Sequence, residues 1–396
     1  QVSTPVNGVP PNIVTTANKP MMMLAASKDH TLFGAIYTDF EDIDGDGLID
    51  TTFIPTFKYY GYFDATKCYT YVSGNSRFEP ARLASTSTVD SKIRYSCGGS
   101  GEWSGNFLNW ATMTRLDVIR KMLYGGKRSA DADTTTANSS GTVLERTNLS
   151  QDSHSFVKYY NGPNIRDYTP FTEENLKKEG GNNPGVYAGL TICNRSDANT
   201  EFGNPVIRLA KGNYLMWATV ERPVCAWSDV SGEGGGPLGA KLARYYVHEN
   251  KGNGRVAHES DRPTLATDGN FGSLSDAQLT MRVQVCKAGL LGEERCQAFP
   301  ESSTTNYKPF GILQEFGLQR GAAVARAEFG VITGGYDKNL TGGVLRKNMG
   351  DFSKEINTTN GIFCHNATFT GCVNGAIKAM DSYILYGRNI GASAPD

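Results

Sequence analysis

Eight cysteines, spread over 396 residues as four sequence-local pairs, are the strongest constraint on how this chain can fold. No two of them form a C-x-x-C motif, which disfavours a zinc ribbon, a thioredoxin-type redox motif and a c-type haem site. We therefore predict disulfides formed in an oxidising compartment. Sequence alone does not fix their connectivity, and the alternative is eight reduced thiols in a cytosolic protein. Pairing neighbours along the chain gives Cys68–Cys97, Cys193–Cys225, Cys286–Cys296 and Cys364–Cys372.

Composition is typical of an exported, loop-rich protein. The 39 Lys plus Arg nearly balance the 40 Asp plus Glu, so the chain has no electrostatic footprint for nucleic acid or an anionic membrane. Glycine (45) and tyrosine (19) are abundant, as in extracellular folds with many turns. No apolar run is long enough for a transmembrane segment. The start at Gln1, without a charged leader, is expected of a mature chain that has lost its signal peptide, or of a truncated piece.

Hydrophobic periodicity predicts a mixture of strands and helices separated by long irregular excursions. The clearest helix pattern covers residues 106–124, with Ser104 or Asn106 as its cap and two glycines, Gly125 and Gly126, at its end. This order of elements predicts an α/β or α+β core with large insertions. The other expected elements are strands at 20–26, 52–72, 281–286, 329–333 and 343–347 and helices at 213–220 and 371–386.

The most specific chemical motif is the acidic loop at residues 42–50, DIDGDGLID. Alternating carboxylates on a tight loop can converge on Ca²⁺, which takes about six to eight oxygen ligands. Phe53 stands where an EF-hand has its bidentate glutamate, so we expect a static extracellular calcium loop instead of a sensor. Ile49 is expected to anchor the loop in the core. The predicted ligands are the carboxylates of Asp42, Asp44, Asp46 and Asp50 and the carbonyl of Leu48, with Asp39 or Glu41 completing the shell.

Two other interpretations of the acidic loop stay open. One is an exposed turn that holds no ion, although mutual repulsion of four carboxylates argues against it. The other is an acid/base pair for glycoside hydrolysis, although such pairs usually come from separate strands.

No other pattern indicates catalysis. The five histidines have no metal-ligand spacing, and neither a nucleophile elbow nor a phosphate-binding glycine loop occurs. The aromatic stretch at residues 59–71 is expected to pack in a core, with sugar or host-surface binding as the alternative. We therefore predict a non-enzymatic protein. The competing functions are a secreted carbohydrate-binding or carbohydrate-active protein and a structural component of a surface filament.

One segment, NFLNWATMTRLDVIRKMLYGG at residues 106–126, resembles the PilC/PilY family of type IV pilus tip-associated proteins. The resemblance covers most of the chain. The further stretches that carry it are YYGYFD at 59–64 leading to Cys68, TVLER at 142–146, RVQVC at 282–286 with GLLG at 289–292, KPFGILQEFG at 308–317 and GGVLRK at 342–347.

The resemblance implies an incomplete von Willebrand A-like core with long, disulfide-braced, loop-rich insertions. Its first strand would be 20–26, its first helix 106–124, its next two strands 329–333 and 343–347, and a later helix 371–386. The segment AASKDH at 25–30 lacks the leading aspartate of a metal-dependent adhesion site, and only Ser27 and Asp29 remain there. The predicted domains are an extended lead-in at 1–19, the first strand, calcium loop and first helix at 20–126, a large insertion at 127–325, and a return to the core at 326–396 that continues beyond this chain.

The resemblance also implies a function at the pilus tip. Such a protein would sit on minor pilins, prime pilus assembly, oppose retraction and adhere to a surface or host receptor. It would be exported through the periplasm and act outside the cell, and a β-propeller would follow it in the sequence. None of these expectations follows from composition or spacing.

Overall fold

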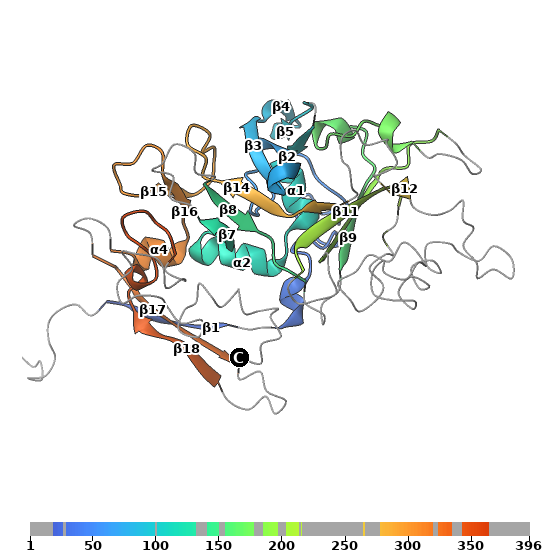
Figure 1. Ribbon diagram of the computed structural model, residues 1–396. Coiled ribbons are helices and arrows are strands. Elements are labelled where there is room, and N and C mark those ends of the chain that lie inside the picture. Colours follow the sequence, from blue (N-terminus) through green and yellow to red (C-terminus); the bar gives the residue numbers. More distant parts are fainter. Residues whose placement is uncertain are drawn as a thin grey trace, which may run out of the picture.

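The chain folds as a mixed α/β structure that is mostly β-sheet with few helices (Figure 1). The computed structural model describes residues 19–26, 29–99, 101–131, 141–149, 155–177, 185–196, 203–213, 215, 264–265, 278–319, 324–334 and 343–363. The predicted mixture of strands and helices is therefore confirmed.

The strands and helices have the following bounds. The strands are β1 (Met21–Ala26), β2 (Lys67–Val72), β3 (Arg77–Leu83), β4 (Ser85–Val89), β5 (Lys92–Ser96), β6 (Glu102–Ser104), β7 (Arg128–Asp131), β8 (Thr142–Glu145), β9 (Phe156–Tyr160), β10 (Leu190–Ser196), β11 (Pro205–Lys211), β12 (Thr264–Leu265), β13 (Gln278–Thr280), β14 (Arg282–Val285), β15 (Cys296–Ala298), β16 (Tyr307–Pro309), β17 (Glu328–Gly334) and β18 (Gly343–Gly350). The α-helices are α1 (Gly105–Thr112), α2 (Arg115–Tyr124) and α4 (Ile312–Gly317), and the 3-10 helices are η1 (His30–Phe33), η2 (Ser73–Asn75), η3 (Ile165–Asp167), η4 (Glu174–Leu176) and η7 (Phe352–Lys354).

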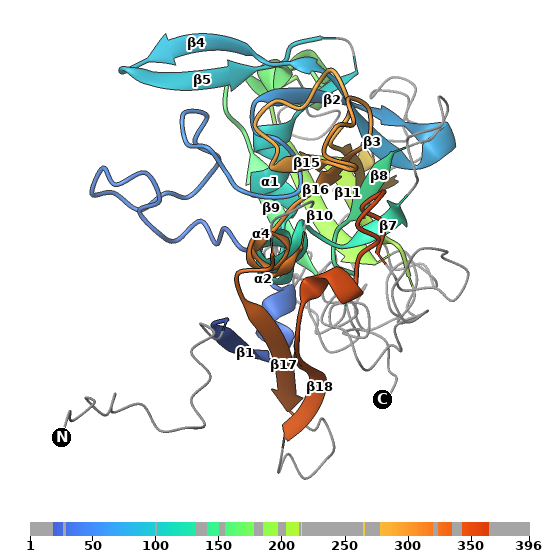
Figure 2. The same cartoon turned by 90° about the vertical axis from the view of Figure 1, so that its left-hand side faces the viewer.

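Three sheets organise most of these strands. The six-stranded sheet has the order β6-β2-β3-β14-β8-β7, and a second sheet runs β12-β11-β10-β9, with β13 also paired to β11. The third sheet is β1-β17-β18, and two further pairs are β4–β5 and β15–β16. The β4–β5 hairpin projects from the body of the molecule, and the three-stranded sheet lies at the opposite end (Figure 2).

The three-stranded sheet joins segments that are about 300 residues apart in the chain. Strand β1 pairs in parallel with β17, from Met21 opposite Glu328 to Ala26 opposite Thr333. Strand β18 pairs antiparallel with β17. The strands predicted at 20–26, 329–333 and 343–347 are therefore confirmed. The von Willebrand A-like core and the domain limits stay predictions, and the helix expected at 371–386 lies outside the described residues.

The helix predicted at 106–124 is two helices, so that prediction was wrong in its continuity. Met113 adopts an extended conformation (φ −80°, ψ 137°) and ends α1. Thr114 then begins α2 with a capping box: its hydroxyl accepts from the Asp117 amide, and the Asp117 carboxylate accepts from the Thr114 amide. This reciprocal cap satisfies free amides at the start of a helix and so favours a new start over a continuous helix. The predicted ends are confirmed, with Ser104 capping α1 and Gly125 ending α2.

The strand predicted at 52–72 is confirmed only at its end, as β2. In the loop before β2, the side chains of two asparagines of α1 form hydrogen bonds with the backbone, which is not paired as a strand. Asn106 accepts from the Tyr59 amide (2.8 Å) and donates to the Phe57 carbonyl (2.7 Å). Asn109 donates to the carbonyls of Tyr59 (2.8 Å) and Phe63 (2.9 Å) and accepts from the Phe63 amide (3.1 Å). The buried backbone is thus satisfied without a ladder, as buried peptide groups require. The strand expected at 281–286 is confirmed as β14.

Aromatic rings fill the main core. Phe107 and Trp110 of α1 lie against Phe53 and Tyr160, with ring centroids 5.2–6.5 Å apart. The residues of the 59–71 stretch in this core are Tyr59, Tyr62, Phe63 and Tyr69, all buried. The core interpretation of that stretch is confirmed for these four. A smaller second core lies between the three-stranded sheet, α4 and the end of α2.

Two of the four predicted disulfides are present among the described residues. They join Cys68 to Cys97 and Cys286 to Cys296. Cys193 is also disulfide-bonded, while its expected partner Cys225 lies outside the described residues. Cys364 and Cys372 lie outside them as well, as does the greater part of the helix expected at 213–220. Within the described part of the chain, no helix has the length and hydrophobicity needed to span a membrane.

Candidate functional site

The acidic loop 42–50 is closed at its base by backbone pairing. Glu41 and Asp50 form an isolated antiparallel bridge, in which the Asp50 amide donates to the Glu41 carbonyl (3.0 Å). Inside the loop, Gly45 and Gly47 have φ values of +77° and +89°. Other L-residues rarely adopt this conformation, so the turn predicted at Gly47 is confirmed and has a physical cause.

Three carboxylates of the loop come together. Asp42, Asp44 and Asp50 each offer one oxygen, and these oxygens all lie within 4.8 Å of one another. Asp42 organises the turn, because its two oxygens accept from the amides of Gly45 (2.8 Å), Asp46 (3.0 Å) and Gly47 (2.9 Å). The Asp50 carboxylate accepts from the Ile43 amide (2.8 Å). Backbone amides therefore hold two of the three carboxylates in place.

The third carboxylate, Asp44, has one oxygen that is not satisfied. Its Oδ2 accepts a hydrogen bond from Lys92 Nζ at 2.8 Å. Its Oδ1 is buried and has no hydrogen-bond partner. A buried acceptor without a donor is costly, and a cation between the three carboxylates would remove that cost.

Lys92 brings a positive charge to the loop from β5, at the end of the projecting hairpin (Figure 2). The hydrogen bond from Lys92 lowers the pKa of Asp44, and the same bond, with the charges of Asp44, Asp46 and Asp50, raises the pKa of Lys92. Lys92 was not among the residues predicted from the sequence. Asp44 and Lys92 are separated by 48 positions in the sequence, so no local pattern could have linked them.

Other residues of the predicted calcium site are placed differently. The Asp46 carboxylate accepts from the Leu48 amide (2.8 Å) and is outside the three-carboxylate group. The Ile49 side chain is 65% exposed, so its predicted role as the anchor was wrong. Ile43 packs against the aromatic core instead. Asp39 accepts from Trp110 Nε1 (2.8 Å) and Lys158 Nζ (2.7 Å), so these two donors engage its carboxylate and it is not free to complete the shell.

The remnant of an adhesion-site motif has a structural role where it is described. Asp29 caps the 3-10 helix η1 by accepting from the Thr31 amide at 2.8 Å. Ser27 lies outside the described residues.

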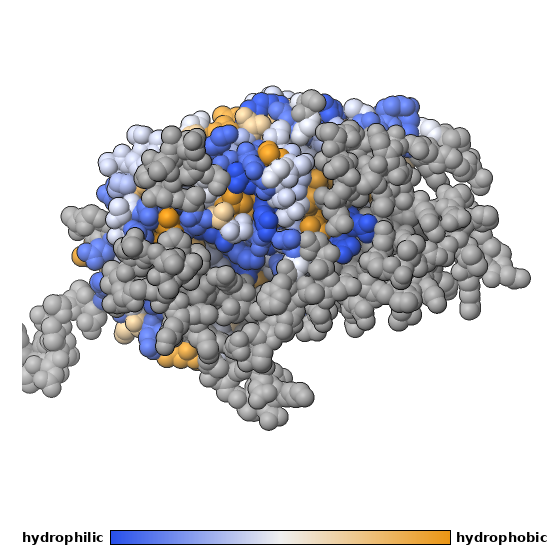
Figure 3. Space-filling model, viewed as in Figure 1, coloured by the Kyte–Doolittle hydropathy of each residue, from blue (hydrophilic) through white to orange (hydrophobic). Residues whose placement is uncertain are grey.

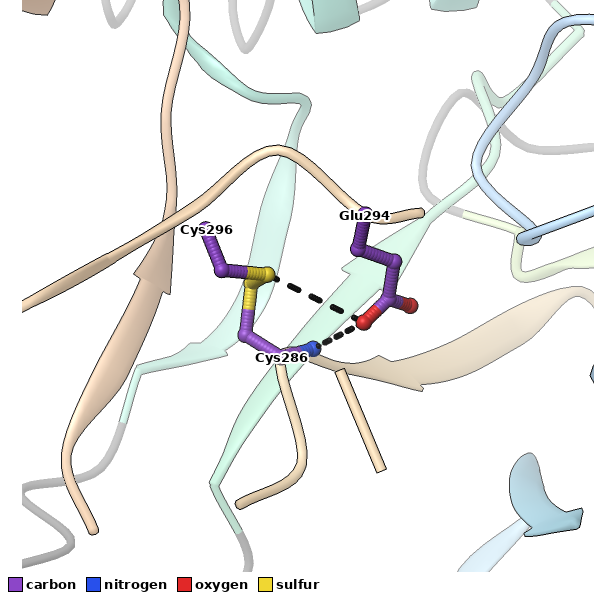
Figure 4. A group of neighbouring side chains, drawn as sticks. All are labelled: Cys286, Glu294 and Cys296. Atoms are coloured by element: carbon purple, nitrogen blue, oxygen red, sulfur yellow. Dashed lines mark hydrogen bonds between the residues drawn. A yellow bond between two sulfur atoms is a disulfide. The ribbon is translucent and has the colours of Figure 1, made fainter. Parts of the chain in front are cut away.

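A second group of chemically reactive side chains surrounds the Cys286–Cys296 disulfide (Figure 4). Glu294 Oε2 accepts from the Cys286 amide at 2.8 Å and lies 3.8 Å from Cys296 Sγ. Because the two sulfur atoms are bonded to each other, they are not available as thiolate ligands for a metal. This group is therefore a structural feature of the loop.

The Glu294 carboxylate forms a buried ion pair with Lys67, next to Cys68 of the other described disulfide. Lys67, which precedes Cys68, has its Nζ 2.8 Å from Glu294 and 3.5 Å from Asp64, and its side chain is 0% exposed. Burial raises the pKa of Glu294 despite this lysine. Gly292 lets the loop approach so closely, because a Cβ there would lie 2.3 Å from Asp64 Oδ2 and 2.5 Å from Lys67 Cε. No pattern in the sequence predicted this ion pair.

Comparison with known proteins supplies the family. Two family models match the chain: "PilY1 homolog, small alpha/beta domain" over residues 50–210 and "PilY1 homolog, second domain" over residues 329–394. A Xylella fastidiosa (strain Temecula1 / ATCC 700964) protein named "Type IV pilus biogenesis factor PilY1 homolog" is 33% identical over 379 residues, which is 93% of this chain and 22% of that protein.

A second protein of the same name and strain is 38% identical over 96 residues, or 24% of this chain and 7% of that protein. The chain thus spans about a fifth of the first relative's length. No solved structure matches it. The resemblance first seen at residues 106–126 is confirmed by these matches, and the chain belongs to the family of PilY1 homologues.

Proposed function

We propose that this chain is part of a type IV pilus biogenesis factor that sits at the pilus tip. The observation that carries the proposal is the 33% identity to a protein with that printed function across 93% of this chain. In this role the protein promotes pilus assembly and adheres to a surface or host receptor, and it catalyses no reaction. Its partners are minor pilins at the tip and the adhesion target.

Compartment and surface chemistry support this proposal over its alternatives. The two disulfides among the described residues favour an oxidising compartment, in keeping with export through the periplasm to the cell surface. The carbohydrate-binding alternative relied on exposed aromatic rings, but Tyr59, Tyr62, Phe63 and Tyr69 are buried. Sugar recognition through these four rings is therefore disfavoured.

Pilus counting tests the assembly role. In a bacterium that carries this gene, we expect its deletion to reduce surface pili seen by electron microscopy and to reduce twitching motility. Plasmid-borne wild-type protein should restore both. Normal piliation in the deletion strain would contradict the assembly role. If deletion cells that still carry pili bind abiotic and host surfaces as well as wild-type cells do, the adhesion role would be contradicted.

We further propose that the acidic loop binds one Ca²⁺ through Asp42, Asp44 and Asp50. The donors fit this ion: all are oxygens, Asp44 Oδ1 is buried without a partner, and the three oxygens lie within 4.8 Å of one another. Opposite ligands of a calcium ion are separated by about 4.6–5.2 Å, twice the usual Ca–O distance. The ion would neutralise the loop and hold its two arms together.

Calorimetry on the oxidised protein tests the calcium site. Asp44→Asn is the sharpest variant, because the Asp44 side chain does not hold the turn as Asp42 does. Asp90→Asn is the matched control, since Asp90 is an exposed acid in the adjacent hairpin turn and lies outside the carboxylate group. We expect binding near one ion per chain, weakened in Asp44→Asn and kept in Asp90→Asn. Absence of heat, with no change in melting temperature, would show that the turn holds no ion.

A further inference from the structure

The two strands of the β4–β5 hairpin have different surroundings. Strand β5 is fixed to the body of the molecule, because Lys92 forms an ion pair with Asp44 at 2.8 Å. A second ion pair joins Arg94 of β5 to Asp167. Strand β4 is the outer strand of the hairpin (Figure 2), and all five of its residues are exposed. The outer edge of β4 is therefore open to a partner.

The open edge of β4 lacks the features that usually protect an edge strand, which are charged side chains, proline and bulges. The strand has the sequence STSTV, and it pairs with β5 without a shift in register. At the top of the space-filling view, where Figure 1 places the hairpin, hydrophilic residues surround only a small apolar patch (Figure 3). The main chain of β4 is therefore the feature that another strand would recognise.

The turn of the hairpin determines which main-chain groups face outward. The two residues between Val89 and Lys92 have φ values of +49° and +64°, as in a two-residue type I′ turn. In such a turn the carbonyl before the turn accepts from the amide after it, so Val89 and Lys92 are a hydrogen-bonded pair. Hydrogen-bonded and non-bonded pairs alternate along an antiparallel ladder. The N–H and C=O groups of Thr86 and Thr88 consequently point away from β5.

We propose that β4 pairs with β4 of a second copy of this chain, antiparallel about a two-fold axis at Ser87. In this register Thr86 of each copy lies opposite Thr88 of the other, and opposed residues of a hydrogen-bonded pair exchange both main-chain bonds. All the outward N–H and C=O groups of these threonines are then bonded. Cross-strand threonine pairs are themselves favourable. Asp90 of one copy lies opposite Ala84 of the other, so the pairing opposes no like charges.

The neighbouring registers satisfy fewer groups. An axis at Thr86 would place Thr88 opposite Ala84, whose amide already donates to the Thr66 carbonyl at 2.8 Å. An axis at Thr88 would place Thr86 opposite Asp90, which lies in the turn. The free groups of β4 are thus symmetric about Ser87, which is the arrangement that a second copy of the same strand matches.

The size of the contact sets the expected strength of the dimer. Two strands of five residues bury less than the roughly 800 Å² per partner of a standard stable interface. We therefore expect a weak, reversible dimer. Because both copies use the same strand, the contact closes on itself and does not extend into a filament. This inference does not depend on the pilus role or on calcium.

Sedimentation equilibrium of the oxidised full chain tests the dimer. Thr88→Pro removes one outward N–H from β4, and Ile93→Pro removes the equivalent N–H from the other edge, because Ile93 is paired with Thr88. We expect a reversible dimer whose dissociation constant rises at least about tenfold in Thr88→Pro and is unchanged in Ile93→Pro. Equal effects of the two prolines would overturn the proposal. A monomer at every concentration would also overturn it, and would leave the edge to a strand of a different protein.

Cysteine cross-linking tests the register without relying on the proline variants. Ser87→Cys places two thiols opposite each other in a non-hydrogen-bonded pair, whose Cα atoms are about 4.5 Å apart and within reach of a disulfide. Thr88→Cys is the matched control, because this neighbouring exposed residue faces Thr86 of the other copy. Under mild oxidation we expect a covalent dimer on a non-reducing gel for Ser87→Cys and much less for Thr88→Cys. Equal cross-linking of the two variants, or none in either, would overturn the proposal.

Discussion

The acidic loop 42–50 and the disulfide loop 286–296 both turn the chain sharply, but their carboxylates lie in opposite surroundings. In the acidic loop, Asp42 is exposed and its oxygens are engaged by backbone amides. In the disulfide loop, Glu294 is only 6% exposed and depends on one lysine. The first loop has surplus negative charge near water, and the second has a buried carboxylate paired with a buried lysine. We expect the first to respond to ions and the second to hold the fold.

Removal of the buried lysine should have the largest effect. Lys67→Met leaves Glu294 and Asp64 buried without their cation, which typically costs about 3–5 kcal/mol of unfolding free energy. Urea denaturation of the oxidised protein measures this. The control is Lys58→Ala, because Lys58 pairs with the neighbouring Glu293 but both side chains are about half exposed. The control should change stability by about 1 kcal/mol or less, and equal effects of the two changes would contradict the difference between buried and exposed pairs.

Removal of the Cys286–Cys296 disulfide should have the next largest effect on the unfolding free energy. Cys286→Ser plus Cys296→Ser opens a loop with a sequence separation of 10 residues, and closing so short a loop stabilises by about 2–3 kcal/mol. The measurement is the same urea denaturation. The acidic loop contains no disulfide. Adding a chelator to a calcium-free sample should therefore not lower the unfolding free energy by a similar amount. A disulfide-free variant as stable as the wild type would show that the Lys67–Glu294 pair alone holds the loop.

The two loops should also respond to pH with opposite sign. Burial raises the pKa of Glu294, so its ionised form is disfavoured in the folded protein, and its contribution to stability is lost as pH rises from the unfolded value of 4.5 through the folded pKa. Lys92 lowers the pKa of Asp44, so its contribution is present above the unfolded value of 3.8 and is lost as pH falls through the folded pKa.

Two isosteric variants separate these contributions. Relative to the wild type, Glu294→Gln should gain stability as pH rises above 4.5, whereas Asp44→Asn should lose stability as pH rises from the folded pKa of Asp44 to the unfolded value of 3.8, with no further change above it. Unfolding in urea from about pH 3 to 8 measures both. Curves of the same sign for the two variants would contradict the proposed difference between the loops.

The sequence predicted local features of both loops better than their partners. The alternating carboxylates and Gly47 predicted a tight acidic turn, and neighbouring cysteines predicted the Cys286–Cys296 bond, because these depend on nearby residues. Lys92 and Lys67 were missed, because each meets its carboxylate only through tertiary packing. Ile49 was predicted as the anchor because it is apolar, but the turn directs Ile43 inward instead.

The same limit applies to the fold. The capping signal of Thr114 and Asp117 was present inside the predicted helix at 106–124, but the continuous hydrophobic pattern outweighed it. The strands at 20–26 and 329–333 were recognised as elements. Their side-by-side position came from the family resemblance, since no pattern within either strand indicates its partner.

Replacement of Lys92 should have the smallest effect on the unfolding free energy. It is the most informative test of the difference between the acidic loop and the disulfide loop. This lysine is half exposed and its ion pair with Asp44 lies near water, so Lys92→Met in calcium-free buffer should change the unfolding free energy less than any of the changes above. If the acidic loop binds Ca²⁺, however, the positive charge of Lys92 repels the ion that Asp44 would bind. The Lys92→Met change should then tighten calcium binding in calorimetry. Lys58→Met serves as the control, because it removes an equal charge that is paired with Glu293 instead. Weaker calcium binding in Lys92→Met than in Lys58→Met would contradict this expectation. It would mean that Lys92, from the β4–β5 hairpin, helps to hold the acidic loop in the conformation that binds the ion.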